Sequence, residues 1–594
     1  MEKNIVKMVQ ERASFYKNRE VFRFKNKQNG NYESISWDEF WTKAQVVARA
    51  LLSMGYGNGS MVGIMSDNMP EWTIADIGIL AAQGIVVPLY ATSSKEQIKF
   101  IVDQTQMKLM FVGNQKQLEN AVWALKNTES LKKVVVFNDN LEFVDNLCIE
   151  WKTFINQNFS TEYDEELKRL IESIKPDDLA TILYTSGTTG EPKGVMLGHD
   201  NFTQCFNIHD KRLNVYESDV SFCFLPLSHV FERSWTYYML YKGAVNVYLE
   251  NTKEVIEDIK VVKPTVMCTV PRFFEKTFDG IQNELQKWSS IKRAIFNWSI
   301  SVGHCVSEYR CKDETLPFML NVKRAIANKL VFKKIRNIFG GQIKFLPCAG
   351  AAINNHHLRF FHAVGIFINY GYGATETTAT VSCFKPDIYD LDSCGTIMPE
   401  VEVRFSEDEE ILVKGKTIFK GYYKNPQATD KAIMDGWYKT GDKGYKTEEG
   451  DLVMTDRIND IFKTSVGKFV SPQKIELALS TDPFIDQVVV FGDNRKYVCA
   501  LIVPSFEKFR AVWDIEGIEE YSNDQLIDHH RIFEFMQKRI EHNLRDFPSY
   551  ERVVKFKMLA EPFTIQNEGL TNTLKVRRKL IAERYKVLIE EMYA

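Results

Sequence analysis

The sequence predicts an α/β protein with three parts: a large N-terminal domain, a small β-subdomain and a small α+β C-terminal domain. A chain of 594 residues is too long for one core, so several domains are expected. Apolar, partly β-branched segments alternate with amphipathic ones over the first half, which indicates strands alternating with helices. From Val401 to Met454 the expected strands are short and turns are frequent, as in a β-subdomain. The domains are expected at 1–457 and 458–594.

The first elements follow from local signals. Ser36 and Glu39 have the spacing of a capping box, so a helix is expected to begin there and to stop at Gly55. A second helix is expected from Pro70 to about Ala82, since proline suits a first helical turn. Strands are expected at 61–65, 85–89, 109–112, 134–137, 243–249 and 264–270. This alternation predicts a mostly parallel sheet with helices on both faces.

Composition excludes several classes of protein. The net charge of −3 does not provide the excess of positive charge that is typical of nucleic-acid-binding proteins. The ten cysteines include no C-x-x-C pair, so a zinc site is not expected. The cysteines are expected to be reduced thiols in a cytosol. The N-terminus lacks the apolar core of a signal peptide, and no run of 18 apolar residues could span a membrane. We therefore expect a cytoplasmic protein.

A loop between Tyr184 and Val195 has the residues of a phosphate-binding site. The apolar run 179–183 before it reads as a buried strand. Glycines let several backbone N–H groups approach one anion, and Lys193 adds a mobile positive charge. The donors and glycines of this loop are Thr185, Ser186, Gly187, Thr188, Thr189 and Gly190. A Walker loop is excluded because Gly194 follows the lysine, and a flexible linker is the competing interpretation.

Further polar residues follow predicted strands along the chain. His229 stands between a strand end and a helix start, where a histidine is usually structural. The small residues Gly350, Ala351 and Ala352 would let a flat base lie against the backbone. After the next strand Tyr372 lies between two glycines, and Glu376 is a hard oxygen ligand suited to Mg²⁺. Asp442 could accept two hydrogen bonds from a ribose, or be a solvated turn residue.

These stretches, in this order, resemble the motifs of the adenylate-forming superfamily, and the Phe-Glu-Arg after His229 is most similar to long-chain fatty acyl-CoA synthetases. The resemblance implies that the loop holds the β- and γ-phosphates of ATP and that Tyr372 stacks on adenine. It also implies that Thr375 touches the α-phosphate and Asp442 binds the ribose. Catalytic roles are implied for Lys575, Glu376, Thr375 and His229, metal binding for Glu376 and Thr185, and nucleotide or coenzyme A binding for Gly373, Arg457 and Gly467.

The resemblance further implies a mobile C-terminal domain with a hinge near Asn459. The segment 456–472 resembles the hinge and the loop after it, and Lys575 stands where the final motif carries its lysine. The sequence departs from the family pattern at Asn459, Val466, Asn572 and Leu574.

The expected activity is activation of a fatty acid with ATP and Mg²⁺ to an acyl-adenylate, followed by transfer to coenzyme A with release of AMP and pyrophosphate. A ligase that passes the acyl group to a carrier protein, a luciferase-type oxygenase and an inactive fatty-acid-binding protein are the alternatives. Acyl chain length and a homodimer are left open. A basic amphipathic helix over 321–337 could lie on the inner face of a membrane, or be a solvated helix with a core face.

Overall fold

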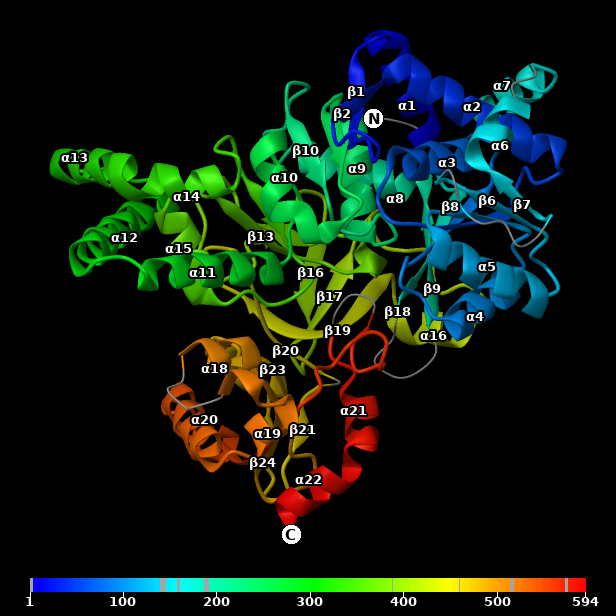
Figure 1. The fold of residues 1–594 in the computed structure, drawn as a ribbon. Coiled ribbons are helices and arrows are strands. Elements are labelled where there is room, and N and C mark those ends of the chain that lie inside the picture. The colour runs from blue at the N-terminus through cyan, green and yellow to red at the C-terminus, as the bar shows by residue number, and fades with distance from the viewer. Residues whose placement is uncertain are drawn as a thin grey trace.

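The computed structural model describes residues 4–138, 141, 146–157, 161–185, 192–386, 388–458, 460–512, 518–571 and 575–594. Figure 1 shows a large N-terminal part, coloured blue to yellow, above a smaller C-terminal part, coloured orange to red. The α/β fold class predicted from the sequence is confirmed, since parallel strands alternate with helices through the first half of the chain. No helix among the described residues is long and apolar enough to cross a membrane.

A seven-stranded sheet forms the first layer of the large part, in the order β7-β6-β5-β3-β4-β8-β9. Its strands are β3 Met61–Met65, β4 Ile85–Leu89, β5 Leu109–Val112, β6 Lys133–Val136, β7 Cys148–Glu150, β8 Leu179–Thr185 and β9 Lys193–Gly198. All neighbours are parallel except β8 and β9, which form an antiparallel hairpin.

Helices cover both faces of this sheet, as the alternating pattern predicted. On β5, Phe111 belongs to the main core, while Met110 and Val112 belong to a second core on the opposite face. Because successive strand residues point to opposite faces, a strand buried on both sides is apolar throughout. The helices of this region are α1 Ile5–Tyr16, α2 Trp37–Ser53, α3 Pro70–Ala81, α4 Lys95–Thr105, α5 Gln115–Asn127, α6 Trp151–Gln157 and α7 Asp164–Ser173. The capping box at Ser36 is present.

The large part contains two further sheets, each of four strands. One has the order β10-β11-β1-β2 and the other β12-β13-β14-β15. Their strands are β1 Glu20–Lys25, β2 Tyr32–Ser36, β10 Val220–Cys223, β11 Val245–Tyr248, β12 Leu346–Cys348, β13 Ile368–Tyr372, β14 Ser382–Cys383 and β15 Thr396–Ile397. The strand expected at 264–270 is not formed: Val266 makes only isolated bridges, to Ser221 and Phe345.

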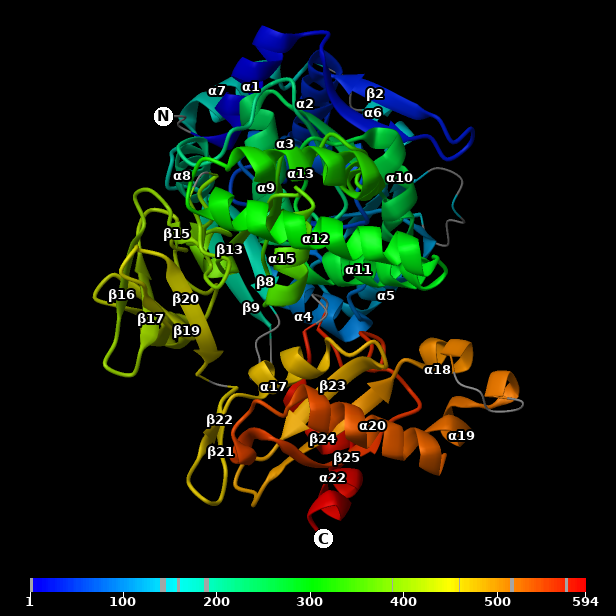
Figure 2. The same cartoon turned by 90° about the vertical axis from the view of Figure 1, so that its left-hand side faces the viewer.

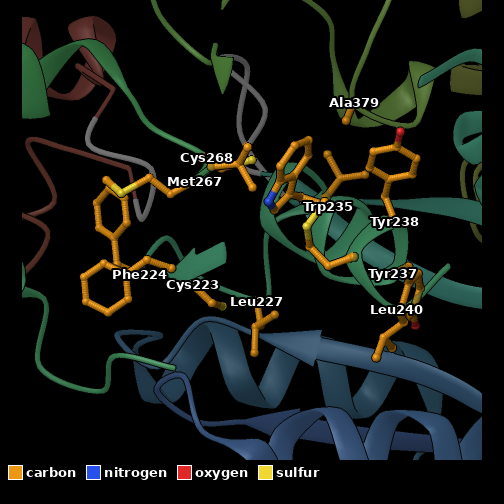
Figure 3. Close-up of a cluster of buried hydrophobic side chains, with 14 of the residues drawn as sticks. Cys223, Phe224, Leu227, Trp235, Tyr237, Tyr238, Leu240, Met267, Cys268 and Ala379 are labelled. Carbon is orange, nitrogen blue, oxygen red and sulfur yellow. The ribbon is translucent and has the colours of Figure 1, made fainter. Parts of the chain in front are cut away.

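The helices around these sheets include α9, which is buried nearly all round. Figure 3 shows part of its packing, where the rings of Trp235 and Tyr238 lie 5.7 Å apart. Its buried residues include polar ones, Glu232 and Arg233 among them, so the helix needs partners for these groups inside the core. The helices are α8 His199–Asp210, α9 Val230–Lys242, the 3₁₀ turn Thr252–Glu254, α10 Val255–Val262, α11 Pro271–Gln286, α12 Ser290–Cys311, α13 Phe318–Ala327, a π-helical turn Asn328–Phe332, α14 Lys333–Ile338, α15 Asn355–Ala363 and the 3₁₀ turn Thr375–Thr377.

The β-subdomain is a five-stranded sheet of order β16-β17-β19-β18, with β20 paired to β19. Its elements are β16 Glu402–Phe405, β17 Glu410–Lys414, α16 Pro426–Ala432, β18 Ile433–Met434, β19 Trp437–Lys446 and β20 Leu452–Arg457. Short antiparallel strands joined by turns were expected over 401–454. Figure 2 shows this sheet beside the helical layer and above the C-terminal part.

The C-terminal part has a sheet of order β23-β24-β25 and a separate hairpin, β21-β22. Described apolar residues from Phe462 onward bury only against one another, so this part has cores of its own. Its elements are β21 Phe462–Lys463, β22 Phe469–Val470, α17 Pro472–Leu479, β23 Ile485–Phe491, β24 Val498–Pro504, α18 Phe506–Val512, the 3₁₀ turn Ile518–Glu520, α19 Asn523–Ile527, α20 His530–Asn543, the 3₁₀ turn Ser549–Glu551, β25 Val553–Met558, α21 Arg578–Arg584 and α22 Lys586–Tyr593.

A buried ion pair joins three elements of the large part. Arg233 of α9 donates hydrogen bonds to both carboxylate oxygens of Asp76 on α3, and to the hydroxyl of Thr181 on β8 at 2.7 Å. Tyr237 also donates to Asp76, at 2.6 Å. A buried charge that loses its partner is left uncompensated, which is far more costly than losing an exposed pair. This network therefore fixes α9 against the strand that leads into the predicted phosphate loop.

We expect Arg233→Ala to lower the free energy of unfolding by about 3–5 kcal/mol, because Asp76 would stay buried without its counter-charge. The matched control is Arg23→Ala, which breaks the partly exposed pair with Glu20 and should cost less than about 1 kcal/mol. Urea unfolding followed by tryptophan fluorescence measures both. Similar losses in the two variants would contradict a stabilising role for the buried pair.

Candidate active site

The predicted phosphate loop connects the two strands of the β8–β9 hairpin. Thr185 ends β8 and is the register partner of Lys193, which begins β9. The loop residues Ser186, Gly187, Thr188, Thr189 and Gly190 lie outside the described residues. The hairpin thus fixes both ends of the loop, and Lys193 lies at the end of a paired strand.

Two neighbouring parallel strands, β12 and β13, end at the same edge of their sheet. The small residues Gly350, Ala351 and Ala352 follow the first strand, and Tyr372 ends the second. Carboxyl ends of parallel strands are where α/β proteins commonly bind ligands. Gly373 admits no side chain, since a Cβ there would lie 1.8 Å from the carbonyl oxygen of Ala379. This close approach holds the following 3₁₀ turn, with Thr375 and Glu376, against the strand.

Glu376 is held by the segment 419–423, which precedes α16. Tyr422 donates a hydrogen bond to its Oε1 at 2.9 Å, and the N–H of Phe419 donates to its carbonyl at 2.8 Å. Burial raises the pKa of Glu376, whereas the Tyr422 hydroxyl and then Lys193 and Lys575 act to lower it. The carboxylate therefore lies in a desolvated position that faces two lysines.

The same segment also reaches the phosphate-loop hairpin. Tyr423 N–H donates to Gly194 and Met196 N–H to Gly421, at 2.8 and 3.0 Å. The Nζ of Lys193 lies 5.1 Å from the centre of the Tyr422 ring, a cation–π distance. Tyr422 thus contacts both Lys193 and Glu376. The sequence analysis missed this residue, because a Gly-Tyr-Tyr run before a helix carries no chemical signal of its own.

Asp442 is fixed by two partners. Its Oδ2 accepts a hydrogen bond from the Tyr372 hydroxyl at 2.6 Å, and Arg457 Nε lies 3.1 Å from its Oδ1. Asp442 and Arg457 are register partners on β19 and β20, so the pair is set by the sheet itself. A carboxylate has about four acceptor positions, so both oxygens keep capacity for further donors. The sequence had not predicted that Tyr372 reaches this carboxylate.

His229 is the N-cap residue of α9, as the strand-to-helix position suggested. Its Nδ1 accepts a hydrogen bond from the N–H of Phe231 at 3.2 Å. Burial, followed by the charge of Lys575, lowers its pKa to about 4. The imidazole is therefore neutral at pH 7, and with Nδ1 as acceptor its Nε2 carries the proton. His229 can offer that N–H to an anion.

Lys575, which follows the last strand in sequence, reaches the large part of the protein. Its pKa is lowered to about 8 by burial and then by the charge of Arg457, against the opposing effect of Asp442 and Glu376, which raise it. The residue as a whole is exposed to solvent, although charged groups of the large part act on its ammonium. The structure thus brings Lys575 together with Glu376, Asp442, Arg457 and His229.

An apolar pocket adjoins Tyr372. Its cavity volume in this structure is small, about 30 Å³, and the cavity opens to solvent. Its lining includes His209, Leu213, Phe231, Ser234, Trp235, Pro347, Cys348, Ala349, Asn369, Gly371, Tyr372, Ala379, Thr380 and Cys383. The far end carries a polar pair, His209 Nε2 and Thr380 Oγ1, 3.0 Å apart. The pocket suits an apolar group that enters beside the candidate site.

Other predicted residues are not brought into this group. Gly467 is exposed in the turn between β21 and β22, in the left-handed conformation with φ 82°. Asn459, at the expected hinge, and Asn572 and Leu574 before Lys575 lie outside the described residues. Within the described ranges, no three His, Cys, Asp or Glu side chains form a cluster that could hold a metal alone.

Comparison with protein-family models gives two matches. The model described as "AMP-binding enzyme" matches residues 9–423, and the model described as "AMP-binding enzyme C-terminal domain" matches residues 459–594. Together they cover most of the candidate site, from the loop of β8 and β9 through Glu376 and Tyr422 to Lys575, while Asp442 and Arg457 lie between the two matched ranges.

Similar proteins are found along nearly the whole chain. Fatty acyl-CoA synthetase A of Dictyostelium discoideum is 28% identical, with 96% of this chain and 87% of that protein aligned. Long-chain-fatty-acid–CoA ligase FadD15 of Mycobacterium bovis is 30% identical, over 95% and 93%. Among solved structures, the anthranilate CoA ligase AuaEII in complex with anthranoyl-AMP gives a TM-score of 0.75 at 17% identity, over 99% of this chain and 98% of that one. The last match shows a shared fold.

The pKa of Lys575 provides a test of the site's electrostatics. Its charge should be present below about pH 8 and be lost as the pH rises through that value, against about 10.4 for an ordinary lysine. Pulse labelling with acetic anhydride at a series of pH values, followed by peptide mass spectrometry, measures the midpoint. Arg457→Gln should raise the midpoint by removing a positive neighbour, and Glu376→Gln should lower it by removing a negative one. Identical midpoints in all three proteins would contradict the described cluster.

Proposed function

Because the chain belongs to the AMP-binding enzyme family, we propose that it is an AMP-forming ligase that joins a long-chain fatty acid to coenzyme A. The observation that carries this proposal is the meeting of Lys575 with Glu376, Asp442 and Arg457 beside an apolar pocket. The cluster suits a phosphorylated nucleotide, and the pocket suits an acyl chain. The named relatives, a fatty acyl-CoA synthetase and a long-chain-fatty-acid–CoA ligase, support this choice of substrate.

The reaction has two steps. In the first, a carboxylate oxygen of the fatty acid attacks the α-phosphorus of ATP; an acyl–oxygen–phosphorus bond forms and the bond to pyrophosphate breaks. In the second, the sulfur of coenzyme A attacks the acyl carbon, AMP leaves, and the thiol proton is released to solvent. The ten cysteines of the chain have no part in either step. Nine of them are buried or partly buried. Burial raises the pKa of eight of these nine, which keeps them as thiols.

The first step brings two anions together, so positive charge and hydrogen-bond donors must offset their repulsion. Lys575 supplies a charge that can lie between the acid's carboxylate and the α-phosphate. His229 supplies the Nε2–H donor, and Lys193 supplies a charge at the β- and γ-phosphates. Asp442, oriented by Arg457, accepts hydrogen bonds from the ribose hydroxyls, while Tyr372 and residues 350–352 border the adenine.

Magnesium fits this set of residues. Mg²⁺ prefers oxygen ligands and usually binds through one or two protein groups together with substrate phosphates, so a cluster of three protein ligands is not required. Glu376 would hold it, with Thr185 at the end of β8 near the phosphates. When bound, the ion supplies positive charge that offsets the phosphate oxygens. Tyr422 donates to Oε1 of Glu376 and leaves the carboxylate capacity for a cation.

The second step needs a different arrangement around the same adenylate. In this structure the charges of Glu376 and Asp442 act on Lys575, whereas Gly467 lies in the exposed turn between β21 and β22. We propose that residues 458–594 turn as a unit about the linker near Asn459, withdrawing Lys575 and bringing the turn of Gly467 toward the path of the pantetheine arm. A few backbone dihedrals in a linker are enough for such a change.

The proposed function is tested by supplying carboxylic acids from acetate to oleate with ATP, Mg²⁺ and either coenzyme A or a phosphopantetheinyl carrier protein. We expect AMP, pyrophosphate and an acyl-CoA thioester, with the longer acids preferred. Acylation of the carrier protein alone would identify an acyl-AMP ligase instead. Absence of ATP–pyrophosphate exchange with every acid would exclude the adenylating activity itself.

Tyr422→Phe should reduce the rate of ATP–pyrophosphate exchange by roughly 10-fold, because a hydrogen bond to a charged carboxylate contributes about 1.5 kcal/mol. The ring, and with it the contact to Lys193, is kept. If Tyr422 acts by orienting Glu376, adding Tyr422→Phe to Glu376→Gln should cause no further loss, since the two changes remove one interaction.

The matched control is Tyr423→Phe, one position further along, whose ring lies 5.3 Å from Lys424 Nζ outside the site. It should leave the exchange rate unchanged. Calorimetric titration of ATP with and without Mg²⁺ gives a readout apart from turnover: Tyr422→Phe should weaken binding only when Mg²⁺ is present. Equal weakening in both titrations would mean that Tyr422 does not act through Glu376.

A further inference from the structure

An apolar stripe runs along the solvent side of α13 and the π-helical turn after it. Phe318 is 78% exposed and Met319 63% exposed, values far above those of ordinary apolar residues in a folded protein. The stripe consists of Phe318, Met319, Val322, Ile326 and Leu330. Residues four apart share one side of a helix, so Phe318, Val322 and Ile326 form a continuous row.

The opposite side of the same helix is already used for packing. Ala327 and Val331 are buried in the main core, and Leu320 packs against it. The helix is therefore apolar on two sides, one facing the protein and one facing solvent. Core packing, which explains the first side, does not account for the second. An exposed contiguous apolar surface of this kind marks an interaction site.

Basic residues flank the stripe, and α13 itself carries no acidic residue, although Asp313 and Glu314 precede it. Lys323, Lys329, Lys333 and Lys334 are exposed, and Arg324 is partly exposed. No aspartate or glutamate stands between Glu314 and Glu376 in the sequence. Of the ion pairs formed by described residues, none includes these five basic side chains. The protein as a whole is slightly acidic, with a net charge of −3, so this positive charge is a local feature.

Two arginines of the neighbouring helices, Arg310 and Arg336, also have positively charged neighbours. The pKa of Arg310 is lowered by burial and then by the charge of Arg324. The pKa of Arg336 is lowered by burial and then by Arg310. Positive groups here repel one another without a carboxylate between them, so an external anion would be stabilising.

The surface extends onto α12, which packs alongside α13. Ile291, Ile295 and Trp298 of α12 are also exposed, by 72%, 39% and 38%. Figures 1 and 2 both show α12 and α13 at the outside of the large part, and in Figure 2 they run across the front of the molecule. The candidate site lies elsewhere, where the large part meets the C-terminal part. The stripe on α13, its basic flank and the exposed face of α12 are called the α12–α13 face below.

Two occupants could cover this face: a second copy of the chain or a lipid bilayer. A symmetric dimer would place the same lysines against one another, and the repulsion would oppose association. A bilayer with anionic headgroups offers negative charge to the lysines and an apolar layer to Phe318 and Met319. An amphipathic helix with a basic flank and aromatic residues is the usual form of an interfacial membrane helix.

We propose that the α12–α13 face docks the protein on an anionic lipid bilayer, with α13 lying in the plane of the headgroups. The inference rests on exposure and charge, and it stands apart from the proposed ligase activity. If that activity is also correct, docking would place the enzyme at the surface where a water-insoluble fatty acid collects.

Co-sedimentation of the full chain with vesicles tests the proposal, without ATP or coenzyme A present. We expect binding to vesicles of phosphatidylcholine mixed with phosphatidylglycerol, and weaker binding to phosphatidylcholine alone. Raising sodium chloride from about 0.05 M to about 0.5 M should weaken binding to the anionic vesicles, since salt screens exposed charges. Lys323→Glu/Lys329→Glu should reduce their binding by at least about 25-fold, because each lysine near an anionic surface contributes roughly fivefold and the substitutions also reverse the charge.

A second variant tests the apolar part of the face. Phe318→Ser/Ile326→Ser should bind the anionic vesicles more weakly than wild type even at low salt. Matched controls lie away from the face. Lys116→Glu/Lys126→Glu on α5 changes the net charge equally, and Val261→Ser/Val587→Ser replaces apolar residues that are 64% and 72% exposed. Both controls should bind like wild type.

Unchanged thermal melting shows that each variant is folded. Binding that falls equally in controls and test variants would overturn the proposal, as would wild type that binds neither vesicle. If light scattering instead shows a wild-type dimer that Phe318→Ser/Ile326→Ser dissociates, the face is an interface between copies and the bilayer is excluded.

Discussion

The candidate site depends on the pairing of one short segment, residues 419–423, with two others. Its backbone hydrogen-bonds to Gly194 and Met196 of β9 and to the carbonyl of Glu376. Backbone hydrogen bonds of this kind are directional, so they set the distance between strand β9 and the 3₁₀ turn after β13. Lys193 and Glu376 come from distant parts of the chain, yet both contact Tyr422: the lysine contacts the ring and the carboxylate accepts from the hydroxyl. This pairing therefore fixes the position of the lysine relative to the carboxylate.

Charge balance is the second condition on the site. Lys575 and Arg457 repel one another, and Asp442 and Glu376 offset that repulsion. Each of these carboxylates is oriented by a tyrosine, Asp442 by Tyr372 and Glu376 by Tyr422, and the neutral His229 is oriented by the N–H of Phe231. Groups fixed in advance lose little free energy when a ligand arrives, because they need not reorganise. The hydroxyls of two buried tyrosines thus serve to orient the carboxylates.

The stability of the large part and the geometry of the site are linked through α9. This helix begins at His229, and Arg233 in its next turn is tied to Asp76 and Thr181. Thr181 lies on β8, four residues before Thr185 at the start of the phosphate loop. The buried ion pair therefore fixes the position of His229 relative to strand β8, which leads into the loop.

The sequence by itself determined the α/β class, the family and the local elements. The capping box at Ser36 and the apolar strand at 179–183 were predicted correctly because their causes are local: a side chain that bonds a nearby N–H, or a run that can be buried only as a strand. Only the tertiary structure decided which residues meet. Tyr422 was missed, and the strand expected at 264–270 is reduced to bridges, because pairing depends on partners far away in the chain. The solvent-facing apolar row on α13 likewise required the fold, since a sequence pattern cannot tell which of two apolar faces the core will cover.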